Sequence, residues 1–197
     1  MKKRPAENLE QIEVKSRADL RAWLAAHHEQ SESIWLVTYK KAVADWYVEY
    51  DAVVEECLCF GWVDSLTRAK DEKRSMLLLA PRNEKSAWSA SNKRRVENLL
   101  AAGLMEPPGL AKIKAAKKNG MWAFLDDVEA LVSPPDLIKA LQRYPNAKAN
   151  FDAFPRSPKR GILEWIKQAK KPETRAKRIE ETARLAETND RANQFKR

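Results

Sequence analysis

The stretch from Cys57 to Arg95 constrains the fold most, because its pattern changes from helix to strand at a single glycine. Residues 52–60 carry apolar side chains at helical spacing, and Gly61 suits the left-handed conformation that ends many helices. Two strands are predicted after it, at Val63–Ala69 and Arg74–Ala80, joined by a tight polar turn. A hairpin that directly follows a helix indicates a sheet with helices packed on it.

Two earlier segments also predict strands. Leu9–Val14 alternates between apolar and polar residues, and Ile34–Tyr39 is apolar and β-branched. With one helix between these strands and another after them, the order of elements is β-α-β-α-β-β. This order predicts an α+β fold, with a small mixed sheet and helices in the N-terminal half, followed by a helical C-terminal region. The pattern leaves the order of the strands in the sheet open.

We expect four segments along the chain. They are a disordered tail at 1–8, a mixed α/β sheet core at 9–85, a helical region packed on that core at 86–187, and a flexible basic tail at 188–197. Hydrophobic residues make up 44% of the 197 residues, which is enough for a sizeable core.

The charge of the chain is basic and unevenly placed. The net charge is +9, and from Arg156 to Arg197 there are 13 Lys or Arg against 6 Asp or Glu. Such a region favours an acidic partner. No long apolar run occurs and none follows the basic start, so we expect neither a membrane span nor a signal peptide. We interpret the two cysteines as reduced thiols, which are typical of cytosolic proteins. Together these features predict a cytoplasmic protein.

Chemistry that depends on a recognisable motif is not indicated. His27 and His28 are the only histidines and are adjacent, whereas a helical pair that shares a metal is three or four residues apart. No His accompanies a Ser or Cys in a nucleophile motif, and no Gly-rich phosphate loop is present. Cys59 is predicted to fill the core. We expect no metal and no cofactor, and the sequence assigns neither a catalytic residue nor an oligomeric state.

The strongest candidate for a binding site lies around the predicted hairpin. Trp62 and Asp64 are two apart on one strand and therefore project from the same face, and the hairpin returns Arg82 towards them. The next helix begins nearby, and its free amides attract anions. We expect a site for a small anionic or planar ligand formed by Trp62, Asp64, Arg82, Trp88, Ser89 and Asn92.

Three other interpretations stay open. In a structural one, Asp64 pairs with Arg82, Ser89 caps the helix and both tryptophans pack in the core. In an enzymatic one, Asp64 is a general acid or base and Arg82 binds an anion. In the third, the basic C-terminal helices contact nucleic acid or an acidic surface, although no nucleic-acid motif accompanies them. The residues of this third site are Lys167, Lys170, Lys171, Arg175, Lys177 and Arg178.

Four segments carry a family resemblance. They read Cys-Phe-Gly-Trp-Val-Asp at 59–64, Pro-Arg at 81–82, Trp-Ser-Ala-Ser-Asn at 88–92 and Ala-Lys-Lys-Pro-Glu-Thr-Arg-Ala-Lys-Arg-Ile at 169–179. With these motifs the chain resembles the YdeI/OmpD-associated family, whose members are often labelled bacteriocin-protection proteins. The resemblance extends from about Trp35 to Leu185. One departure is Ser65, which stands where family members usually have Gly.

The resemblance implies a soluble bacterial protein linked to resistance against bacteriocins, cationic antimicrobial peptides or stress. It implies no catalytic mechanism. We therefore expect a cytoplasmic resistance protein that acts by binding a ligand or a partner rather than by catalysis.

Overall fold

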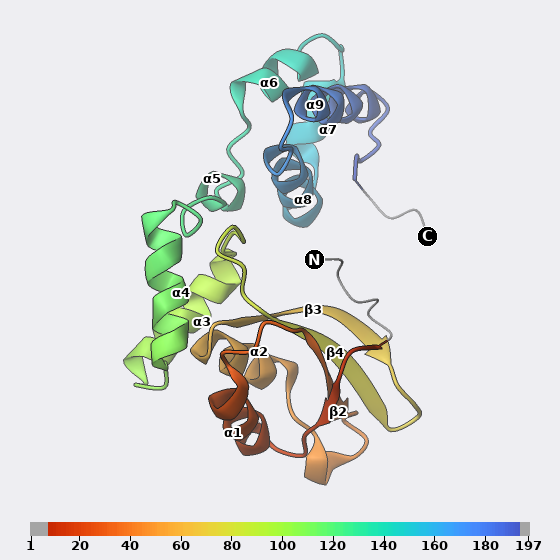
Figure 1. Cartoon of the computed structure of the whole chain (residues 1–197). Coiled ribbons are helices and arrows are strands. Elements are labelled where there is room, and N and C mark those ends of the chain that lie inside the picture. Colours follow the sequence, from red (N-terminus) through yellow and green to blue (C-terminus); the bar gives the residue numbers. More distant parts are fainter. Residues whose placement is uncertain (1–7, 194–197) are drawn as a thin grey trace. The chain divides into compact units, whose positions relative to one another are not determined.

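A computed structural model describes residues 8–193 of the chain (Figure 1). Residues 1–7 of the predicted N-terminal tail and 194–197 of the predicted C-terminal tail lie outside this range. The chain divides into two compact units, the first ending at Ala123 and the second beginning at Phe124. The predicted fold class is confirmed, since a mixed sheet lies in the N-terminal half and the C-terminal half is helical.

The sheet of the first unit has the strand order β1-β2-β4-β3. Its strands are β1 (Gln11–Glu13), β2 (Ile34–Tyr39), β3 (Trp62–Ala69) and β4 (Arg74–Pro81). β1 runs parallel to β2, and the other neighbours are antiparallel. The second strand of the hairpin therefore lies inside the sheet beside β2. This agrees with the burial of Leu77 and Leu79, which are 6% and 0% exposed.

Helices cover this sheet and fill its core. The helices of the first unit are α1 (Arg17–His27), the short 3-10 helix η2 (Ala44–Trp46), α2 (Tyr50–Cys59), α3 (Ala90–Ala101) and α4 (Pro107–Lys118). Figure 1 shows α1 and α2 next to each other against the sheet. Trp62 and Trp88 are among the largest fully buried side chains, and burial of a large apolar side chain contributes about 1.5–3 kcal/mol.

Two glycines fix how α2 ends and how α4 packs on it. Gly61 has φ +74° and ends α2 in the left-handed region, as its position predicts. Gly109 lies in the first turn of α4, where a Cβ atom would stand 2.3 Å from the carbonyl oxygen of Cys59 and 2.5 Å from that of Leu58. Only a glycine allows the backbones of α2 and α4 to approach this closely.

The second unit is helical throughout its described part. Its helices are α5 (Asp126–Glu129), α6 (Pro135–Leu141), α7 (Ala147–Ala153), α8 (Arg156–Lys167) and α9 (Pro172–Glu187). The long helix α9 packs against α6, α7 and α8. Leu137, Phe151, Ile162 and Ala183 are fully buried between them. Among residues 8–193, no helix is both long and apolar enough to cross a membrane.

Candidate functional site

Arg82 lies at the end of β4, where the hairpin returns it to the start of β3. Its backbone amide donates to the carbonyl oxygen of Gly61 at 2.9 Å, and Pro81 pairs with Trp62 in the sheet. The side chain is unusual for an arginine, because the residue is only 4% exposed. Arginine is almost never fully buried unless it is paired.

The guanidinium of Arg82 stacks on Trp88 and is only partly satisfied. It lies 3.8 Å from the centroid of the Trp88 ring, and Nη2 donates to the carbonyl oxygen of Ala87 at 2.7 Å. Nε and Nη1 are buried and have no hydrogen-bond partner in the described part of the chain. Burial lowers the pKa of Arg82 to about 10, against the opposing effect of the nearby Asp64 charge. At neutral pH the group is still a cation.

Trp88 belongs to a larger group of aromatic and basic side chains. Its ring lies 5.1 Å from that of Trp122, and the ammonium groups of Lys93 and Lys117 lie 5.5 and 5.2 Å from the Trp122 centroid. We call Arg82, Trp88, Trp122, Lys93 and Lys117 the Arg82–tryptophan cluster. Sequence reasoning missed three of its members, since their positions on α3, α4 and the following loop do not indicate that they converge.

Ser89 and Asn92 lie at the start of α3, directly after Trp88. The Ser89 hydroxyl accepts a hydrogen bond from the backbone amide of Asn92 at 3.3 Å, which is the arrangement of an N-cap. Ser89 therefore has the capping role that the structural interpretation gave it. Both residues are adjacent to the cluster along the chain.

Trp62 and Asp64 point to other partners. Trp62 is fully buried, donates through Nε1 to the carbonyl oxygen of His28 at 3.3 Å, and meets Trp23 edge-on at 5.6 Å. Asp64 accepts a hydrogen bond of 2.5 Å from the hydroxyl of Tyr50. The structure thus does not form the Asp64–Arg82 ion pair of the structural interpretation.

The Asp64–Tyr50 pair affects the tyrosine strongly. Partial burial, and after it the hydrogen bond to Asp64, raises the pKa of Tyr50 to about 12. The phenol is therefore protonated at neutral pH and donates to the carboxylate.

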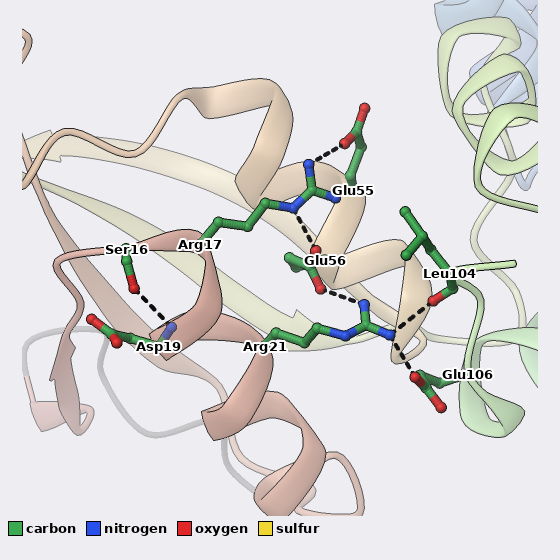
Figure 2. A network of polar contacts seen from close by, with 8 residues as sticks. All are labelled: Ser16, Arg17, Asp19, Arg21, Glu55, Glu56, Leu104 and Glu106. Carbon is green, nitrogen blue, oxygen red and sulfur yellow. Dashed lines mark hydrogen bonds and ion pairs between the residues drawn. The ribbon is translucent and has the colours of Figure 1, made fainter. Parts of the chain in front are cut away.

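An ion cluster around the buried Glu56, which the sequence did not predict, joins α1, α2 and the segment before α4 (Figure 2). Glu56 is 1% exposed and accepts from Arg17 Nε at 2.6 Å and from Arg21 Nη1 at 2.9 Å. Arg21 also donates to the carbonyl oxygen of Leu104 at 3.0 Å and to Glu106. The signal in the sequence was a glutamate on the apolar face of α2. Its two guanidinium partners satisfy it, so the cluster has a structural role.

The two cysteines are buried and chemically quiet. Burial raises the pKa of Cys57 well above its ordinary value. Burial and then the charge of Glu56 raise the pKa of Cys59 to about 11. Since the thiolate is the reactive form, neither thiol is activated as a nucleophile at neutral pH.

Three of the six basic residues proposed to contact nucleic acid or an acidic surface make contacts within the protein, and the other three are exposed. Lys167 forms an ion pair with Asp127, and Arg175 binds Asp136 through two nitrogens. Arg178 donates to the carbonyl oxygen of Trp165 and lies over its ring. The other three side chains, which are exposed, are Lys170, Lys171 and Lys177. Half of the predicted contact residues are therefore occupied within the protein.

Each of the two units contains a stretch that matches a known protein family. Residues 12–112, which are 101 of the 197, match a family described as a domain of unknown function (DUF8412). Residues 130–189 match the family described as bacteriocin-protection, YdeI or OmpD-associated. No curated protein and no solved structure shows significant similarity to the chain.

The four motifs that carry the family resemblance do not all lie in the same matched range. The motifs at 59–64, 81–82 and 88–92 lie in the stretch that matches the domain of unknown function. The motif at 169–179 lies in the stretch that matches the bacteriocin-protection family. The chain therefore belongs to the DUF8412 family through its first unit and carries in its second unit a domain of the YdeI/OmpD-associated, bacteriocin-protection family.

Proposed function

We propose that this protein binds a small planar anion at the Arg82–tryptophan cluster, and that this binding serves protection against bacteriocins or antimicrobial peptides in the cytoplasm. The observation that carries the binding proposal is the pair of unpartnered nitrogens on the buried Arg82. Buried polar groups in proteins are nearly all hydrogen-bonded, and buried charges are normally paired. An anion beside Nε or Nη1 supplies a missing partner.

The chemistry of the cluster favours a planar carboxylate over a simple ion. A guanidinium binds the two oxygens of a carboxylate through its Nε–Nη2 or Nη1–Nη2 edge, with two parallel hydrogen bonds. A carboxylate that takes the place of the Ala87 carbonyl at Nη2 of Arg82 therefore also satisfies Nε or Nη1. The Trp88 and Trp122 faces suit a flat ring, and Lys93 and Lys117 add positive potential beside Trp122. An aromatic carboxylate uses all three features.

Access to Arg82 requires a movement of the loop that connects β4 to α3. Arg82 and Trp88 are buried, whereas residues 83–85 of this loop are exposed. The carbonyl of Ala87, which accepts from Nη2, lies in the same loop. Displacement of this loop exposes the guanidinium of Arg82 to a ligand. The bound ligand then takes the place of the loop residues that packed over Arg82.

The charge of the protein also restricts how protection works. With a net charge of +9, the chain repels a cationic peptide at long range. Direct capture of a cationic bacteriocin is therefore disfavoured. We propose that the protein acts through an anionic ligand instead, with the link to protection taken from the family of residues 130–189.

Thermal unfolding in the presence of defined probes tests the binding proposal. Benzoate is the planar anion, inorganic phosphate the non-planar anion, benzyl alcohol the planar neutral probe and benzylamine the planar cation. We expect stabilisation in the order benzoate, phosphate, benzyl alcohol, and none from benzylamine. A ligand at 100 times its Kd stabilises by about 2.7 kcal/mol, which raises Tm by roughly 5–10 °C in a chain of this size.

Variants locate the effect. Arg82→Met should abolish the shift in Tm caused by benzoate, whereas Arg68→Met should leave it unchanged. Arg68 is the matched control because it also lies over a tryptophan, 5.2 Å from the Trp35 centroid, but is exposed and outside the cluster. Asp64→Asn should increase the shift, since it removes a carboxylate close enough to influence Arg82. If neither benzoate nor phosphate stabilises the protein, or if Arg82→Met responds like the wild type, the binding proposal is wrong.

A bacterial assay tests the link to protection. Cells that lack this protein are complemented with the wild type or with Arg82→Met and challenged with a bacteriocin, with protein levels compared by immunoblot. We expect Arg82→Met to reach the wild-type level and to protect less. Full protection by Arg82→Met would separate the resistance function from this site.

A further inference from the structure

The second unit contains a cavity of about 700 Å³ between α6 and α9. This volume is within the range of small-molecule sites in proteins, about 300–1,000 Å³. Its lining residues are Asp136, Lys139, Ala140, Arg143, Pro172, Arg175, Ala176, Lys177, Ile179 and Glu180. All of them belong to the part of the chain that matches the bacteriocin-protection family.

Both carboxylates of the cavity are already bound by neighbours. Arg175 binds Asp136 through Nε and Nη2 at 2.8 and 2.9 Å. Glu180 accepts from the hydroxyl of Tyr144 at 2.6 Å and from Arg143. These contacts compensate the two negative charges in place. The lining contains four cations and two carboxylates, so two positive charges are left over.

The two remaining cations are Lys139 on α6 and Lys177 on α9. Both are exposed, and neither takes part in an ion pair or side-chain hydrogen bond within residues 8–193. They lie on the two helices that border the cavity. An anionic group that enters between α6 and α9 therefore finds a lysine without a competing partner on each of the two helices.

The floor of the cavity is aliphatic. Ala140 and Ile179 are 4% and 7% exposed, and Ala176 and Pro172 add further apolar surface. None of the lining residues is aromatic, so a flat ring finds no face to stack on. An aliphatic chain suits this floor, because its burial needs only non-directional apolar contact.

We propose that this cavity binds a monomeric amphipathic anion, with one carboxylate at Lys139 and Lys177 and an aliphatic chain over Ala140, Ala176 and Ile179. The uncompensated positive charge of the two lysines on the rim favours an anionic headgroup, and the apolar floor favours an aliphatic chain. The site differs from the Arg82–tryptophan cluster in its residues and in the shape of its ligand. The proposal does not depend on the proposed function of that cluster.

Binding of dodecanoate to the full chain, measured by calorimetry below the micelle concentration, tests this proposal. The comparison probes are dodecanol, dodecylammonium and acetate, which lack the charge, reverse it or lack the chain. We expect dodecanoate to bind at least about tenfold more tightly than each of them, a difference of about 1.4 kcal/mol. Equal affinity for dodecanol would mean that the rim charge plays no part and would overturn the proposal.

Matched variants assign the site. Replacement of both Lys139 and Lys177 by Ala should weaken dodecanoate binding about tenfold or more. Lys148→Ala is the control, because Lys148 is an exposed lysine of the same unit that is paired with Asp152. Arg82→Met should not change dodecanoate binding, which separates this site from the cluster in the first unit. An unchanged affinity in the double variant would overturn the assignment.

A vesicle experiment distinguishes the free ligand from a membrane surface. Vesicles of phosphatidylglycerol present anionic headgroups with their chains buried in the bilayer. We expect monomeric dodecanoate to bind and the protein to stay in solution when the vesicles are sedimented. Sedimentation with the vesicles together with no binding of dodecanoate would refute the proposal in favour of a surface contact.

Discussion

The guanidinium of Arg82 lies 3.8 Å from the ring centroid of Trp88, and two of its three nitrogens have no hydrogen-bond partner among the described residues. Burial lowers the pKa of Arg82 to about 10 from an ordinary value of 12.5. This difference corresponds to a cost of roughly 3 kcal/mol for keeping the buried group charged. This cost to the folded state is the reason for our proposal that Arg82 serves binding.

Replacement of Arg82 by an apolar residue should therefore not destabilise the protein. Arg82→Met loses the hydrogen bond to Ala87 and the stacking on Trp88 but removes an unpaired buried charge, so we expect a change between zero and about 2 kcal/mol in favour of the variant. Urea unfolding measures it, with Arg68→Met as the exposed control. A loss of more than about 2 kcal/mol would show that Arg82 is structural.

Glu56 should be the most sensitive acidic residue of the first unit. It is 1% exposed and bound by Arg17 and Arg21, so Glu56→Gln should cost about 1.5–3 kcal/mol through the loss of charge-assisted hydrogen bonds. Glu55→Gln is the matched control, since its side chain is 30% exposed and makes one ion pair, and it should cost less than about 1 kcal/mol. Chemical unfolding of both variants provides the measurement. Equal losses in the free energy of unfolding would mean that the burial of Glu56 does not add to the strength of its ion pairs.

The Tyr50–Asp64 pair predicts a pH dependence in the alkaline range. The pKa of Tyr50 is raised in the folded state to about 12 from an ordinary value of 10. The unfolded chain therefore loses this proton first, and the stability from Tyr50 is present below pH 10 and is lost as the pH rises through 12. Tyrosinate absorbance, taken as the difference between the wild type and Tyr50→Phe, follows this titration.

Asp64→Asn provides the control for that titration. It removes the charge of the carboxylate that the hydroxyl of Tyr50 contacts, and the pKa of Tyr50 should move back towards its ordinary value of 10. The residual elevation then reports partial burial together with the charges of Arg95 and Asp51. An identical titration in the wild type and in Asp64→Asn would contradict the hydrogen bond.

Two glycines should respond in opposite directions to the addition of one methyl group. Gly109→Ala places a Cβ 2.3 Å from the Cys59 carbonyl oxygen, so α2 and α4 must separate, and we expect a loss of about 2–3 kcal/mol or more. Gly161→Ala in α8 meets nothing within 4 Å and should stabilise the protein by about 0.5–1 kcal/mol. Thermal unfolding of the two variants measures both effects. A tolerated Gly109→Ala would contradict the close packing of α2 and α4.

Much of the fold follows from local pattern. The strands at Ile34–Tyr39 and in the hairpin, the left-handed Gly61 and the N-cap at Ser89 depend on residues that are close together in the sequence. Such elements are set by side-chain alternation, by backbone freedom and by local hydrogen bonds, all of which can be read from a short window. The return of Arg82 to the start of β3 followed in the same way from the hairpin.

The members of the candidate site could be read only in part. Asp64 and Arg82 were brought near each other by the hairpin, yet Asp64 bonds to Tyr50 on α2, whose approach no local pattern predicts. Trp122 lies 34 residues beyond Trp88 in the sequence and joins it through the packing of the segment after α4. Side-chain partners at such separations depend on how elements pack, and sequence spacing carries no information about this.

The sequence by itself thus determined the fold class, the hairpin, the N-cap at Ser89, the left-handed Gly61 and the family motifs, because each depends on neighbouring residues. The tertiary structure alone decided the strand order and the partners of the buried charges. The carboxylate of Glu56 is bound by two guanidinium groups, while the guanidinium of Arg82 contacts only an indole face and one carbonyl oxygen. The physical reason is that desolvation of a charge is a local property of a buried position, whereas its compensation requires a partner that only the packed chain brings within reach.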